Sequence, residues 1–97
     1  MTEQEMILVI AMEECNEVAQ AISKILRFGV DSTHPISGDT NNTQLETEMT
    51  DLFTILFILV SRGITKVPSA EKMMEKTERI IQSLELSLKL GRVQSIK

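Results

Sequence analysis

The stretch EECNEVAQAISKILRFG, residues 13–29, decides how this 97-residue chain folds. Its apolar residues recur every three to four positions, which is typical of an amphipathic helix. Gly29 follows the last of them, and glycine just past a helix end closes the final turn in a left-handed conformation. Three glutamates lie within five residues at the start of the stretch. Whether they face water or the core determines what the protein can do.

Similar signals mark two further helices. Gly63 and Gly91 also end long periodic stretches. Capping residues precede all three helices: Thr2 with Glu5 for the first, Asn41 with Gln44 or Thr43 with Glu46 for the second, and Ser69 for the third. We therefore predict helices near residues 3–28, 42–62 and 69–90, with a turn-rich loop at 29–41.

The pattern predicts an all-α fold, with residues 1–97 forming a single helical domain. Three main helices of this length make a thin core. The second helix is apolar on nearly every side between Leu52 and Val60, interrupted only by Thr54. A helix that is apolar all round needs neighbours on all sides. We therefore expect a helix bundle completed by homo-oligomerisation, as a homo-dimer or a tetramer.

Composition narrows the possible partners and the compartment. The net charge of −4 and the scarcity of aromatic residues, three Phe with no Trp or Tyr, argue against nucleic-acid binding. The N-terminal MTEQEM is acidic where a signal peptide is basic. The longest apolar run, LFTILFILV (52–60), is about half the length of a membrane span. The single cysteine, Cys15, fits a reducing compartment. We expect a cytoplasmic protein that binds neither nucleic acid nor membrane.

The first helix carries a carboxylate inside its apolar stripe. Successive helix residues turn by roughly 100°. With Glu17 at zero, the stripe holds Phe28 and Ile10 at about +20°, Ala21 at about +40°, and Ile7 and Ile25 at about +80°. Glu14, at about +60°, therefore falls inside the stripe, with Glu17 at its edge and Glu13 on the same shoulder.

The second helix repeats this arrangement. With Glu48 at zero, its apolar neighbours are Ile55 at about −20°, Leu59 at about +20°, Leu52 at about +40° and Leu45 at about +60°. Glu48 thus lies at the centre of the stripe, and Asp51 lies beside it. Glu46 points almost the opposite way and is an ordinary surface residue.

Carboxylates on buried faces require a counter-charge. An ionised carboxylate buried without a partner costs several kcal/mol. Lys24 is the one cation well placed on these faces, and one cation cannot offset four anions, whereas a divalent metal can. All-oxygen ligands suit Mg²⁺, Ca²⁺ or Mn²⁺. Because Mg²⁺ usually meets its substrate through phosphate oxygens, the cluster indicates phosphate-ester or anhydride chemistry.

The chain resembles a known enzyme family in these residues. EECNE (13–17) followed by ETEMTD (46–51) is similar to the E-E-x-x-E … E-x-x-D signature of the MazG-like, all-α nucleotide pyrophosphohydrolases. SKILRFG (23–29), HPISGDTN (34–41) and LETEMTDL (45–52) resemble the short, phage- or mobile-element-type members. The resemblance covers roughly residues 10–60 and implies Mg²⁺-dependent cleavage of nucleoside triphosphates to monophosphate and pyrophosphate, in house-cleaning or nucleotide-pool control.

Carried over by position, the resemblance implies a role for each carboxylate. It assigns the metal, Mg²⁺ with Mn²⁺ as a possible substitute, to Glu14, Glu17, Glu48 and Asp51. It implies that Glu13 either supports the metal ligands from beside them or helps to orient the attacking water.

Four other residues are candidates for substrate binding. Lys24 and Arg27 continue the face of Glu17 and would bind phosphates, although surface cations with solvated heads have the same pattern. Asn41 would cap the second helix, contact the sugar, or do both. His34 would reach the base, or belong only to the loop.

Two alternative functions remain open on the sequence. One keeps the fold and reaction class with another substrate, as in phosphoribosyl-ATP pyrophosphohydrolases of the same superfamily. The other is a non-enzymatic helical interaction or regulatory module whose acidic cluster is merely solvated.

Overall fold

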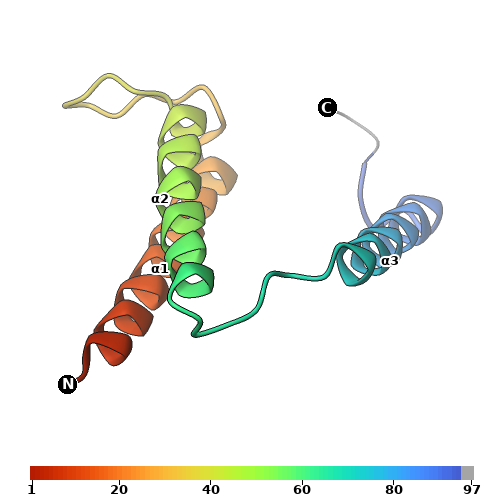
Figure 1. The fold of residues 1–97 in the computed structure, drawn as a ribbon. Helices are drawn as coiled ribbons and strands as arrows, with labels where there is room; N and C mark the ends of the chain where they lie inside the picture. Colours follow the sequence, from red (N-terminus) through yellow and green to blue (C-terminus); the bar gives the residue numbers. More distant parts are fainter. Residues whose placement is uncertain (95–97) are drawn as a thin grey trace. The chain divides into compact units, whose positions relative to one another are not determined.

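A computed structural model describes residues 1–94 as three helices: α1 (Glu3–Phe28), α2 (Asn41–Ser61) and α3 (Ala70–Lys89), shown in Figure 1. The described residues contain no strand, only an isolated bridge between Thr33 and Thr40. The predicted all-α class is thus confirmed, and each helix boundary lies within one residue of its predicted position. Within this part of the chain, no helix has the length and hydropathy needed to cross a membrane.

The glycines end α2 and α3 as predicted. Gly63 and Gly91 both have φ of 72°. After α2, the N–H of Gly63 donates to Val60 and that of Ile64 to Leu59, at 2.9 and 3.0 Å. These two bonds form the motif that commonly closes a helix at a left-handed glycine. They also turn Ile64 back onto the core.

The start of α2 differs from the prediction. Neither Asn41 nor Thr43 caps this helix; the cap is Thr40, whose side chain accepts the backbone N–H of Thr43 at 3.1 Å. Asn41 is already inside the helix and only 7% exposed, and its Nδ2 donates to the carbonyl of Gly29 at 2.9 Å. This bond engages the side chain that the sequence offers as a cap and ties the start of α2 to the end of α1.

The first compact unit, Met1–Lys66, is an antiparallel pair of helices. Asn41 and Gly29 meet at one end of the pair, and Glu3 and Arg62 form an ion pair at the other. The core between the helices is small and consists of Ile7, Ala11, Ile55 and Leu59, with Leu52, Ile58 and Ile64 packed against it. The buried stripe of α1 is narrower than predicted, because Ile10 is 37% and Phe28 is 62% exposed.

The second compact unit begins at Val67 and contains α3. Ser69 caps this helix as predicted, accepting the backbone N–H of Lys72 at 3.2 Å. The apolar residues Met73, Ile80 and Leu84 lie within about 40° of one another around the helix axis. This unit therefore has the amphipathic pattern of a helix that packs along one face.

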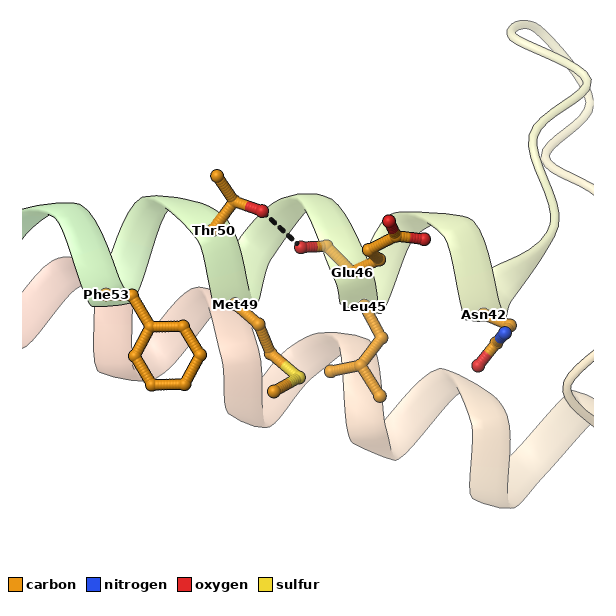
Figure 2. A pocket seen from close by; sticks show the side chains of 6 residues that line it. All are labelled: Asn42, Leu45, Glu46, Met49, Thr50 and Phe53. Carbon is orange, nitrogen blue, oxygen red and sulfur yellow. Dashed lines mark hydrogen bonds between the residues drawn. The ribbon is translucent and has the colours of Figure 1, made fainter.

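The outer side of α2 carries a second apolar surface. A shallow pocket of about 360 Å³ lies there. Figure 2 shows the residues that line it: Asn42, Leu45, Glu46, Met49, Thr50 and Phe53. Phe53 is 62% exposed, and Phe57, one turn further along, is 72% exposed. We refer to Met49, Phe53 and Phe57 as the outer face of α2. This exposure matches the prediction that the helix is apolar on nearly every side.

We expect the buried amide of Asn41 to be a main determinant of stability in the first unit. Asn41→Ala deletes a buried hydrogen bond and should lower the free energy of unfolding by about 1–2 kcal/mol. At this chain length, each kcal/mol corresponds to a fall in Tm of about 4–8 °C. The exposed Asn42 provides the matched control, and Asn42→Ala should change Tm little. Equal losses in thermal melts of the two variants would contradict this role for the Asn41 bond.

Candidate active site

The antiparallel register of α1 and α2 determines which carboxylates face one another. Glu3 pairs with Arg62 across the two helices. Glu14 is eleven residues after Glu3, and Asp51 is eleven residues before Arg62. Because both helices rise by the same amount per residue, Glu14 and Asp51 lie at the same level. The same counting brings Glu17 level with Glu48.

Three of these carboxylates form a group that could hold a metal ion. Glu14, Glu48 and Asp51 each offer one oxygen, and these oxygens all lie within 4.8 Å of one another. Glu14 and Glu48 are half-buried, and Asp51 is exposed. An all-oxygen set of this kind suits a hard divalent cation such as Mg²⁺, Ca²⁺ or Mn²⁺. The donor chemistry of these residues therefore fits a divalent metal.

The pKa of Glu48 shows that two further charged residues, Glu17 and Lys24, lie close enough to influence this group. Partial burial raises the pKa of Glu48, and the negative charges of Glu17, Asp51 and Glu14 raise it further. Glu17 is outside the set of three but is the strongest of these charges. The positive charge of Lys24 lowers the pKa of Glu48 and opposes them. The charges of three carboxylates and one lysine thus all act on the carboxyl group of Glu48.

A cationic cavity lies beside the acidic group. Its volume is about 360 Å³, and the residues that line it are Lys24, Arg27, Phe28, Ser32, Thr33, His34, Pro35 and Asn41. None of the carboxylates among residues 1–94 lines it. The guanidinium of Arg27 lies over the ring of Phe28, 5.1 Å from its centroid. Lys24 belongs to both places, because it lines the cavity and its charge acts on Glu48.

The structure thus places the predicted site residues in two neighbouring groups. Lys24, Arg27, His34 and Asn41, predicted one by one, all line the cavity. Glu13 is exposed on α1 and lies outside the group of three. Glu46 lies on the other side of α2, in the pocket of Figure 2, as its helical position predicts.

Sequence reasoning missed part of the cavity wall. Phe28 was predicted to lie in the apolar stripe of α1, but it is mostly exposed and lines the cavity instead. Ser32, Thr33 and Pro35 come from the loop, whose path the sequence pattern does not specify. One sequence signal could have indicated the role of Phe28: it directly follows Arg27 at the end of the helix, where a guanidinium can lie over an aromatic ring.

The raised pKa of Glu48 predicts a pH effect on the metal-free protein. The folded state keeps the Glu48 proton to higher pH than the unfolded state, so this group lowers stability as pH rises above the ordinary glutamate range of about 4.3. Glu48→Gln removes the effect. In urea unfolding with EDTA, the variant should be as stable as wild type or more so at neutral pH, with the gap closing in acid. A wild-type advantage that grows with pH would contradict this reading.

A comparison with protein families agrees with this geometry. The model of the MazG nucleotide pyrophosphohydrolase domain matches residues 2–81. No curated protein and no solved structure shows a significant match to the chain. The matched region includes the whole antiparallel pair with its acidic group and cavity, and this family generally depends on a divalent metal. The chain belongs to the MazG nucleotide pyrophosphohydrolase family.

Proposed function

We propose that this protein is a Mg²⁺-dependent nucleoside triphosphate pyrophosphohydrolase. It would convert a (d)NTP and water to the (d)NMP and pyrophosphate by cleaving the anhydride bond between the α and β phosphates. The observation that carries the proposal is the position of Lys24, which joins a group of carboxylates to a cavity without carboxylates. A triphosphate needs cations along its length, and a metal site adjoining a lysine and an arginine would provide them. Such an activity serves house-cleaning or control of the nucleotide pool.

In this proposal, four carboxylates hold the metal: Glu14, Glu17, Glu48 and Asp51. Glu14, Glu48 and Asp51 offer the converging oxygens, and the register of the two helices places Glu17 opposite Glu48. Mn²⁺ is a reasonable substitute because it accepts the same oxygen ligands. Bound there, the metal ion would neutralise charge on the phosphate oxygens and lower the pKa of a coordinated water.

The remaining site residues act on water and on the substrate. Glu13 directly precedes Glu14 on α1 and is exposed. Its carboxylate would orient the attacking water and accept its proton. Lys24 and Arg27 would bind phosphate oxygens from the cavity side. His34 and Asn41 would contact the nucleoside or the phosphates from the loop end of the cavity.

We also propose that the bundle is completed by a second copy of the chain. The outer face of α2 exposes two phenylalanines, at 62% and 72%, and extends over about two turns of the helix, from Met49 to Phe57. Contiguous exposed apolar surface of this kind marks an interaction site in proteins of this size. A homo-dimer, or a tetramer made of two dimers, would cover it.

The activity test uses two glutamates of one helix. With Mg²⁺ or Mn²⁺, the purified protein should release pyrophosphate from at least one nucleoside triphosphate in a panel that includes phosphoribosyl-ATP. Each of Glu14→Gln, Glu17→Gln, Glu48→Gln and Asp51→Asn should lower kcat at least about 100-fold, since each removes a charge from the metal site. Glu46→Gln should leave kcat within about twofold, because Glu46 lies on the opposite side of α2.

The two glutamates make this contrast sharp, because they are two residues apart and chemically identical. Loss of activity on changing Glu46, with activity retained on changing Glu48, would overturn the proposed site. Absence of turnover on every substrate with either metal would overturn the proposed reaction.

The assembly test places a charge on the outer face of α2. Light scattering of the wild-type protein at micromolar concentration should return the mass of a dimer or a tetramer. Phe53→Glu should shift the protein toward the monomer because the carboxylate would be desolvated at the interface. Thr47→Glu adds the same charge at an exposed position outside this face and should leave the mass unchanged. A monomeric wild-type protein would refute the proposed assembly.

A further inference from the structure

The loop between α1 and α2 is folded around its histidine. The backbone N–H groups of Ile36 and Ser37 donate to Nδ1 of His34, at 3.1 and 3.3 Å. The backbone of His34 closes the same turn: its N–H donates to the carbonyl of Asp39 at 2.8 Å, and its carbonyl accepts from the N–H of Gly38 at 2.9 Å. His34 is therefore held by its side chain and its main chain at once.

These bonds determine which ring nitrogen carries the hydrogen. A backbone N–H can only donate, so Nδ1 of His34, which faces two of them, must present its lone pair. In a neutral imidazole, the hydrogen is then on Nε2. The loop thus holds His34 as the Nε2–H tautomer, whose remaining polar atom is a hydrogen-bond donor.

The cavity that His34 lines holds two cationic side chains, Lys24 and Arg27. Both donate hydrogen bonds and cannot accept them, and no carboxylate of the part of the chain that the structure describes contributes to the wall. The amide nitrogen of Asn41 is engaged by Gly29. A ligand oxygen seated between Lys24, Arg27 and the ring of His34 would therefore meet a hydrogen-bond donor from each of the three side chains.

We propose that His34 determines specificity in this cavity by donating its Nε2–H to an acceptor oxygen of the ligand. The shared chemistry is an oxygen acceptor, and a phosphoryl oxygen and a nucleobase carbonyl are its two possible sources. The identity of the ligand rests on the proposed function. The tautomer and the binding contact do not require turnover, so they can be tested separately from the reaction.

Nuclear magnetic resonance gives a direct test because His34 is the only histidine in the chain. The ring ¹⁵N signals at about pH 8.5, where imidazole is neutral, should show hydrogen on Nε2. The probes are inorganic tripolyphosphate and the α,β-imido analogues of the four dNTPs, each with Mg²⁺. A shift of the Nε2 signal with both kinds of probe identifies a phosphoryl oxygen, and a shift with nucleotide analogues alone identifies a base carbonyl. Hydrogen on Nδ1, or no shift with any probe, would overturn the proposal.

Two variants separate the donor from the structural role of His34. The side-chain oxygen of His34→Asn can accept from the same loop N–H groups, but this variant has no donor in the place of Nε2. It should keep the wild-type Tm and bind the best imido analogue about tenfold more weakly, the effect of one lost hydrogen bond. His34→Gln carries an amide N–H that reaches further into the cavity, so it should bind more tightly than His34→Asn. Wild-type affinity in His34→Asn, or the reverse order of the two variants, would show that His34 only supports the loop.

Discussion

The register between α1 and α2 is the constraint on which the rest of the structure depends. It is fixed at one end by the hydrogen bond from Asn41 to the carbonyl of Gly29, and Glu3 and Arg62 meet at the other. The interior bond is the stronger determinant, because exposed ion pairs contribute little to stability. A slip of one residue would rotate the apolar stripes apart by about 100° and take Glu48 away from Glu14. The same alignment thus creates the core and gathers the carboxylates.

This arrangement puts function and stability in conflict. Glu14 and Glu48 occupy positions in the apolar stripes where leucine or isoleucine would add to a core with few buried side chains. The raised pKa of Glu48 shows the cost, because burial and three neighbouring anions all disfavour its charged form. A folded domain tolerates such a cluster when a cation offsets it. The charge of Lys24 offsets a small part of this repulsion, and the family to which the chain belongs generally depends on a divalent metal.

Local signals predicted the helices and most of the acidic group. Caps and terminal glycines act within one turn, so Ser69 and Gly63 mark helix ends regardless of the fold, and the face of Glu48 follows from helical geometry alone. The errors have long-range causes. Thr40 replaces Asn41 as the cap because Asn41 bonds to a residue twelve positions away. Phe28, the last residue of α1, is 62% exposed and lines the cavity together with loop residues, whose positions no helical periodicity specifies.

Lys24 is common to the acidic group and to the cavity. It lines the cavity, and its positive charge also acts on Glu48. Arg27 is three residues further along the helix, and stacking on Phe28 keeps its guanidinium on the cavity side. Positive charge therefore rises along α1 as one moves from Glu14 toward the loop. The order of charges on one helix therefore separates a surface that suits cations, at the carboxylates, from a surface that suits anions, at the cavity.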